Sequence, residues 1–404
     1  MTPPLRSRRF LVFVLAWSVL SAAFMFADFD QVVPLELDDP LAVNGIGGTA
    51  ATLALVLLGL PLGVLVDRAR RRSALTVVPL LAAAGGLSVL AADALGSRSD
   101  GHAIAVLTTT GVLTAVASVV RDACLPAIAG RERLVPANAL LSVAPPVLAL
   151  CLAAVLSLLD DLADVTVPLL TVTMAAGAAL LFRTVDAAEE PAPPASGLRR
   201  EMTEAVRFTA RHPVLRAIAL YLVVSALVAE FADEVADGAL RVAAESAAIP
   251  LGSYFSVVSL SALLVPFVGA LLAVLLHRKV GVLRLACAAL LVSQPFTLLL
   301  ALSGSRGGAI WYVVGTLVPM TGTAVAAVAL LSHRQALTPD RLLGRVGGLL
   351  LALATLADAL GELLETPATL PTLLPGVAVA TLAALAATVP LLRTVTAQKS
   401  DTPV

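Results

Sequence analysis

Four carboxylates lie within ten residues of this chain, in the segment AEFADEVADG (229–238), although only 14% of its residues are charged and 59% are hydrophobic. Glu230, Asp233 or Glu234, and Asp237 recur at helical spacing, so they can share one face of a helix. Acids that are crowded together and partly removed from water can take up and release protons near neutral pH. The segment is therefore a candidate for proton coupling or for binding a cation.

These acids lie in a chain of hydrophobic blocks, each about 20 residues long, which is the length that a helix needs to cross a bilayer. The chain has 404 residues, a formal net charge of −1 and a mean hydropathy of +0.95. So small a net charge gives no electrostatic reason to bind nucleic acid. We expect the lipid bilayer as the environment and no nucleic-acid partner.

Apolar runs between charges and turn residues predict twelve membrane-spanning helices in two sets of six. The first set is expected at residues 10–35, 43–66, 73–95, 103–120, 135–159 and 165–183. The second set is expected at residues 214–237, 252–276, 281–303, 308–332, 345–366 and 371–392. A polar, Pro-rich and then amphipathic stretch separates the sets, which is typical of a linker. The predicted organisation is an N-terminal six-helix bundle (1–184), a cytoplasmic linker (185–212) and a C-terminal six-helix bundle (213–404).

Basic residues, which favour the cytoplasmic side of a membrane, predict the orientation. With the N-terminus inside, all but three of the 27 Arg and Lys residues fall on cytoplasmic segments; the exceptions are Arg98, Arg241 and Arg306. The start of the chain also resembles a secretory signal peptide, but the equally apolar remainder favours a first membrane helix. We expect a multi-pass protein of the inner (cytoplasmic) membrane with both termini in the cytoplasm.

Ionisable groups within membrane spans cost ~2.5–3.5 kcal/mol each on insertion scales, so they usually face a cavity or a partner. The candidate proton-coupling or substrate-binding acids are Asp28, Asp30, Glu230, Asp233, Glu234 and Asp358. No Lys or Arg lies nearby in the predicted helices, so local ion pairs cannot neutralise all of these acids.

Depth along the helices separates these acids. Asp28, Glu230, Asp233 and Asp358 are the deeper ones. Water-exposed carboxylates of an outer vestibule explain Asp30, Asp237, Glu362 and Glu365 equally well. Trp17, about 12 Å along the first helix from Arg9, could stack on substrate, although a packed or lipid-facing Trp is as good an explanation.

The segment GVLVDRARRRSAL (63–75) follows the second predicted span. A basic cytoplasmic turn explains its arginines, but it does not explain Asp67 among them. An acid here can pair with Arg68 or Arg71, or it can face the positive N-terminal end of a neighbouring helix. Such contacts would hold one arrangement of the two halves and release in the other.

At these residues the chain resembles the major facilitator superfamily, whose signature between helices 2 and 3 is Gly-x-Leu-x-Asp-Arg-x-Gly-Arg-Arg. The matching residues are Gly63, Leu65, Asp67, Arg68, Arg71 and Arg72, whereas Arg70 replaces the second Gly. Three further segments and this replacement resemble the branch of enterobactin exporters and macrolide efflux pumps. These segments are RDACLPAIAGRERLVPANALLS (121–142), RHPVLRAIAL (211–220) and RQALTPDRLLGRV (334–346). The implied fold is an all-α polytopic membrane protein with twelve helices in two six-helix bundles.

The resemblance implies that Asp67 caps or pairs near the start of helix 11, close to Gly344 and Arg345, in the outward-open state. The candidate conformational latch comprises Gly63, Asp67, Arg68, Arg71, Arg72 and Arg345. The corresponding loop after helix 8 has basic residues but no Asp, so the latch is expected on one side only. The Gly-rich helix 5 motif and the helix 4 arginine of family antiporters are missing, so proton coupling does not follow from them.

Two short matches predict an internal repeat, as in transporters built from parallel six-helix halves. FADFDQV (26–32) resembles FADEVAD (231–237), and RDACLP (121–126) resembles RQALTP (334–339). The second pair is expected after the fourth helix of each half.

The leading hypothesis is a monomeric secondary transporter that exports a small organic molecule, cationic or amphipathic, in exchange for protons. The cargo would be a drug, a siderophore or a metabolite. An uncoupled facilitator or importer of the same fold, and a non-transporting membrane sensor, are the alternatives. The sequence has no phosphate loop, metal-binding His-Glu helix, nucleophile elbow or paired-Cys motif. We therefore expect no enzyme activity, no cofactor and no metal site.

Overall fold

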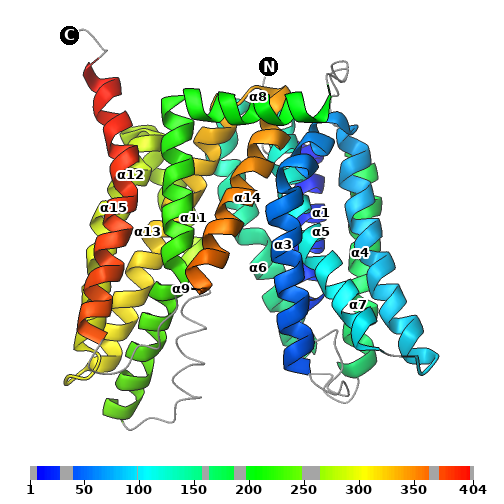
Figure 1. Ribbon diagram of the computed structural model, residues 1–404, viewed down its shortest axis with the longest axis horizontal. Coiled ribbons are helices and arrows are strands. Elements are labelled where there is room, and N and C mark those ends of the chain that lie inside the picture. Colours follow the sequence, from blue (N-terminus) through cyan, green and yellow to red (C-terminus); the bar gives the residue numbers. More distant parts are fainter. Residues whose placement is uncertain are drawn as a thin grey trace. The chain divides into compact units, whose positions relative to one another are not determined.

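The computed structural model describes residues 7–27, 40–97, 99–156, 163–185, 197–247, 264–363 and 373–400, and the regular structure in these ranges is helical (Figure 1). In the N-terminal part of the chain the helices are α1 (Arg8–Ala27), α3 (Pro40–Arg68), α4 (Arg71–Ala94), α5 (Asp100–Ala129), η1 (Arg131–Arg133), α6 (Leu134–Leu156), α7 (Ala163–Arg183) and α8 (Leu198–Arg211). They are followed by α9 (Pro213–Ala247), α11 (Val265–Val280), α12 (Val282–Ser293), η3 (Gln294–Leu302), α13 (Gly308–Leu337), η4 (Asp340–Leu342), α14 (Leu343–Glu362) and α15 (Leu373–Ser400).

Ten helices among the described residues are long and apolar enough to cross a membrane. The other two predicted spans correspond to α7 and α11. The apolar part of α7 runs over Pro168–Arg183, and α11 is described from Val265 because the first part of predicted span 252–276 lies outside the described residues. The predicted all-α, multi-span membrane architecture is confirmed.

Three helices run well beyond their predicted ends. The chain was expected to leave the helix at residues 120, 237 and 332, whereas α5, α9 and α13 continue to Ala129, Ala247 and Leu337. RDACLP therefore lies inside α5, and RQALTP begins in the last turns of α13, so the placement of both after their helices is wrong. Hydropathy marks where a helix leaves hydrocarbon, whereas the helix itself continues in water while its residues favour it.

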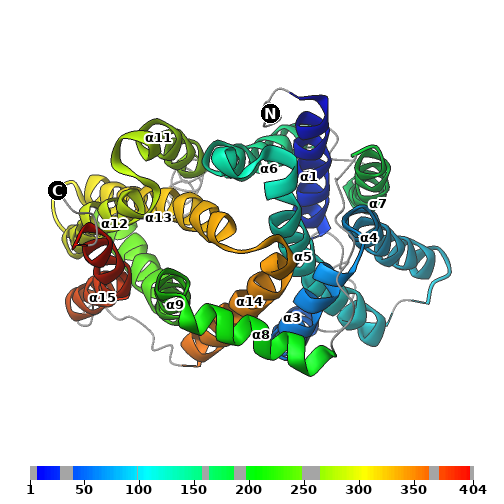
Figure 2. The ribbon, with the colours of Figure 1, turned by 90° about the horizontal axis from the view of Figure 1, so that it is seen from above.

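The first of two compact units comprises Met1–Val206 with Gln335–Ala352. Within it α1 lies between α6 and α7 (Figure 2) and also contacts α5. The α4 helix packs on α5 and α7, and α3 packs on α5. Large apolar side chains fill the core around α1, including Phe10, Phe13, Leu20, Leu125 and Phe182. This unit positions Asp67 and the segment that it contacts.

The second unit comprises Arg207–Arg334 with Leu353–Val404. Its α15 packs on α9, α12 and η3, and the core between them includes Leu240, Leu300 and Val377. The acids of α9 and the second half of α14 belong to this unit. The division into bundles 1–184 and 213–404 stays a prediction.

Candidate functional site

Asp67 lies one residue before the end of α3, and its side chain is only 3% exposed. Its Oδ1 accepts the backbone N–H of Gly344 at 2.6 Å, and its Oδ2 accepts that of Arg345 at 2.9 Å. Both N–H groups belong to the first turn of α14, where donors lack a partner within the helix. The carboxylate satisfies two of these donors and interacts favourably with the positive end of the helix dipole.

Glycines allow α3 and α14 to approach closely at this contact. A Cβ on Gly63 would collide with the Gly344 carbonyl oxygen and would lie 3.0 Å from the Gly344 carbonyl carbon. A Cβ on Gly348 would likewise collide with the carbonyl oxygen of Gly59. Glycines spaced by four lie on one helix face, and such a face is typical of close helix packing in membranes. The absence of side chains here lets Asp67 reach the backbone of α14.

Arg345 joins the same contact to helix α8. Its Nη2 lies 2.9 Å from Glu201 Oε2, its Nη1 donates to Glu204 Oε2 at 3.1 Å, and its Nε lies 3.5 Å from Asp67 Oδ2. Only 6% of the Arg345 side chain is exposed. A buried charge requires compensating partners, and here acids of α3 and α8 surround the guanidinium.

Glu201 is shared between two arginines. Its side chain is 3% exposed, and besides Arg345 it accepts Arg68 Nε at 3.1 Å and Arg68 Nη2 at 2.9 Å. Glu204, one turn later, is 36% exposed and also accepts Arg341 Nη1 at 2.7 Å. We call Asp67, Arg68, Glu201, Glu204, Arg341 and Arg345 the latch cluster.

Four of the six predicted latch residues meet here: Gly63, Asp67, Arg68 and Arg345. Arg72 instead donates from Nη2 to the Arg183 carbonyl oxygen at 2.6 Å, where it places a cation at the negative end of α7. Arg71, half-buried at the start of α4, lies close enough for its charge to act on Asp67. That this arrangement acts as a conformational latch stays a prediction.

Glu201→Gln is expected to destabilise the protein more than Glu204→Gln does. The first change removes a buried carboxylate shared by Arg68 and Arg345, a loss of about 3 kcal/mol, whereas the second removes a partly exposed one, worth about 1 kcal/mol or less. Thermal melting of the detergent-solubilised full chain measures the difference. Equal melting temperatures for the two variants would show that Glu201 contributes no more to stability than Glu204 does.

A second group of contacts surrounds the turn that joins α13 to α14. Arg131 of η1 donates from Nη1 to the carbonyl oxygens of Gln335 and Ala336, at 2.9 and 2.8 Å. Its Nη2 donates to the Thr338 carbonyl oxygen at 2.9 Å and to Asp340 Oδ1 at 2.6 Å. Arg131 therefore covers the last carbonyls of α13, which have no partner within the helix.

The predicted acids of α9 and α14 lie in the second unit. The side chains of Asp233, Asp237 and Asp358 are exposed, and the charges of Asp237 and Asp358 act on Asp233. Glu230 and Glu234 are half-buried on α9. The structure thus brings Asp233 of α9 near Asp358 of α14, which the sequence placed 125 positions apart.

Two other observations bear on the predicted acids. Arg241 falls on α9, one turn after Asp237, because this helix extends beyond its predicted end. The expectation that this helix carries no basic residue near its acids is therefore wrong. Asp28 and Asp30 lie outside the described residues.

Trp17 is 7% exposed and lies in the core of the first unit. The guanidinium carbon of Arg121 lies 4.8 Å from the centre of its ring, within the range of a cation–π interaction. Arg121 in turn forms an ion pair with Asp122 at 2.7 Å. Trp17 is therefore packed in this structure, and its role in binding substrate stays a prediction.

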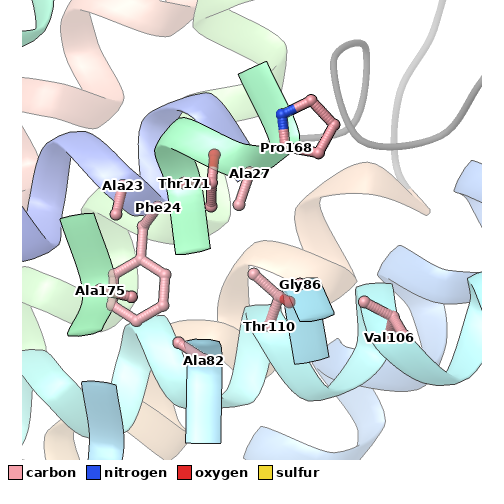
Figure 3. Close-up of a pocket in the computed structure, with 10 residues that line it drawn as sticks. All are labelled: Ala23, Phe24, Ala27, Ala82, Gly86, Val106, Thr110, Pro168, Thr171 and Ala175. Carbon is pink, nitrogen blue, oxygen red and sulfur yellow. The ribbon is translucent and has the colours of Figure 1, made fainter. Parts of the chain in front are cut away.

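A small cavity lies between α1, α4, α5 and α7 (Figure 3). Its lining is apolar apart from Thr110 and Thr171, and Phe24 projects from α1 into the group. Its volume of about 20 Å³ suffices for about one water molecule. This cavity is too small for an organic substrate.

The described residues contain no group of three or more His, Cys, Asp or Glu side chains that could hold a metal ion.

In comparisons with known proteins, no family model and no curated protein matches the chain. Solved structures do match it. A bacterial homologue of the iron transporter ferroportin, in an outward-facing state, is 15% identical over 96% of this chain and 99% of that chain, with a TM-score of 0.72.

Two other solved structures agree with the first. The Major Facilitator Superfamily transporter FucP, in the outward conformation, is 14% identical over 93% of this chain and 97% of that chain, with a TM-score of 0.71. The human organic anion transporter MFSD10 is 19% identical over 96% of this chain and 99% of that chain, with a TM-score of 0.65. This chain has the major facilitator fold. The three neighbours are named as transporters or as a transporter homologue.

Three residues of these contacts, Glu201, Glu204 and Arg131, were not predicted from the sequence. The two glutamates lie three residues apart on the amphipathic helix α8, so their shared face was a usable signal. Arg131 offered a weaker signal, because it looked like one more basic residue of a cytoplasmic loop. The narrower likeness to enterobactin exporters and macrolide pumps stays a prediction.

Proposed function

We propose that this chain is a secondary transporter that exports a small organic molecule across the inner membrane by alternating access. It works as a monomer with both termini in the cytoplasm. The observation that carries the proposal is the buried Asp67 carboxylate on the first turn of α14. Water can replace such hydrogen bonds when two helices separate, so the contact suits a latch that forms and releases in each cycle.

The strength of the contact fits this role. Hydrogen bonds to a charged group contribute about 1.5–3 kcal/mol each, enough to shift a two-state equilibrium by about 10- to 100-fold. The resemblance of the Asp67 motif assigns the closed latch to the outward-open state. Release of α14 from α3 then accompanies opening toward the cytoplasm.

Proton coupling is proposed to use the acids of α9 and α14. Asp233 and Asp358 carry like charges close together, so uptake of a proton or of a cationic substrate relieves their repulsion. A site that accepts one or the other, but not both, exchanges them across the membrane. Glu230 and Glu234, on the same helix as Asp233, are proposed as further members of this site, while Asp28 and Asp30 stay separate candidates from the sequence.

The test uses right-side-out proteoliposomes loaded in turn with members of a panel of macrolides, siderophores and lipophilic cations. We expect an inward proton gradient to accelerate efflux of at least one compound. Glu230→Gln combined with Asp233→Asn should abolish the acceleration, whereas Glu362→Gln, at an exposed acid near the end of α14, should preserve it. Efflux that ignores the gradient and survives the double variant would exclude proton coupling.

An importer is the second candidate, because one of the matching structures is named as the fucose:proton symporter of E. coli. Uptake driven by the inward proton gradient, with no accelerated efflux, would identify it. Flux in both directions without any response to the gradient would identify a facilitator. A membrane sensor predicts no flux for any compound.

A further inference from the structure

The turn between α13 and α14 is held at both of its helix ends. The carbonyl oxygens of Gln335, Ala336 and Thr338, at the end of α13, accept from Arg131, and the first N–H groups of α14 donate to Asp67. The last carbonyls of a helix carry partial negative charge, and the first N–H groups carry partial positive charge. Each charged side chain is therefore opposite in sign to the helix end that it contacts, so both contacts are attractive.

We propose that Arg131 is a second lock of the same latch, and that it must leave the α13–α14 turn whenever Asp67 leaves α14. Arg131 is a positioning residue here, since it acts through the turn. This proposal rests on the transport function proposed above. Its test therefore measures the conformation of α14 without any substrate, so that the two proposals can fail separately.

Arginine is suited to this position for a geometric reason. Its planar guanidinium presents several donors in a fixed fork, and here two of its nitrogens reach three carbonyl oxygens and one carboxylate. A lysine ammonium is a compact charge on a flexible stem and cannot reproduce this fork. If Arg131 acts through the carbonyl oxygens, Arg131→Lys should weaken the contact with the α13–α14 turn, but less than Arg131→Gln does.

The Asp340 ion pair alone does not explain the arrangement. The Arg131 and Asp340 side chains are 39% and 40% exposed, and exposed ion pairs contribute little. The three carbonyl contacts are independent of that carboxylate. Asp340→Asn is therefore a matched control that removes the ion pair and keeps the cap.

Hydrogen bonds of buried side chains fix the position of the end of α13, whose carbonyl oxygens Arg131 contacts. Gln335 is fully buried; its Oε1 accepts Asn138 Nδ2 at 2.8 Å, and its Nε2 donates to the Asp122 carbonyl oxygen at 3.3 Å. These bonds join the end of α13 to α5 and α6. They are neutral, so they position the carbonyls while Arg131 supplies the charge.

The experiment measures how fast a buried cysteine on α14 reacts. The native Cys124, Cys151 and Cys287 are replaced, and Val346, which is 1% exposed, is changed to Cys. Membrane vesicles with the full chain receive a short pulse of N-ethylmaleimide. A second reporter, Ala178→Cys at a fully buried position of α7, detects general loosening.

For Val346→Cys we expect Arg131→Gln to raise the labelling rate by about tenfold, Arg131→Lys by about threefold and Asp340→Asn by less than about twofold. Arg131→Gln combined with Asp67→Asn should multiply the two single effects, because two locks on one equilibrium add in free energy. Labelling of Ala178→Cys should not change.

Three outcomes would overturn the proposal: labelling at the unaltered rate in Arg131→Gln, equal rates for the Lys and Gln variants, or an equal rise at both reporters. The transport proposal fails on different grounds, namely absence of flux for every compound. Faster labelling without flux would leave Arg131 as a lock of a non-transporting membrane protein.

Discussion

Asp67→Asn is expected to raise the labelling rate of a Val346→Cys reporter by about 30-fold. Asn keeps one acceptor oxygen, but its amide nitrogen would face a backbone N–H of Gly344 or Arg345, so one buried donor loses its partner. An unsatisfied buried donor and the lost charge together remove about 2 kcal/mol or more, which corresponds to about 30-fold in the equilibrium. Transport should slow as well if the proposed latch is part of the transport cycle.

Asp100→Asn is the matched control for this variant. Asp100 is an exposed acid in the first turn of α5, so its replacement also removes a negative charge from a helix N-terminus but breaks no buried contact. We expect labelling of Val346→Cys to stay within about twofold in this control. Similar rates for the two variants would mean that Asp67 contributes only surface charge, and the latch would have to lie elsewhere.

Much of the latch could be predicted from short-range patterns. An acid within a basic loop is unusual, and that alone distinguishes Asp67 from the arginines around it. Pro339 and Asp340 favour a helix start, which provides the acid with a partner. The close glycine packing was not predicted, because Gly63 was named only as a residue of the motif, and Gly59 and Gly348 lie outside the motif.

The rest depends on tertiary placement. Glu201 pairs with Arg68 and Arg345, which are 133 and 144 positions away in the sequence. No spacing rule within α8 specifies which arginines this helix contacts. Arg131 contacts backbone carbonyl oxygens, and because every residue has one, the sequence does not indicate which of them Arg131 binds. The contact of Trp17 with Arg121 likewise depends on the packing of α1 on α5, which no pattern in the sequence specifies.

Gly63→Ala is expected to open the contact between α3 and α14 and to have a large effect on labelling. The new Cβ would collide with the Gly344 carbonyl oxygen. Because the atoms on both sides of this contact are backbone, no flexible side chain can move to relieve the collision. Overpacking of this kind costs about 3 kcal/mol or more, so α3 and α14 must separate and the Asp67 contact must open. Labelling of Val346→Cys should rise by more than about 100-fold, with transport nearly lost.

Gly48→Ala on the same helix provides the control, because a Cβ there would meet nothing within 4 Å. It should leave labelling and transport unchanged. The double variant Gly63→Ala with Asp67→Asn is decisive, since both changes open one contact. Its labelling should barely exceed that of Gly63→Ala alone, because a hydrogen bond that is already broken cannot be lost again. Full multiplication of the two effects would instead mean that the glycine packing and the Asp67 carboxylate act at separate places.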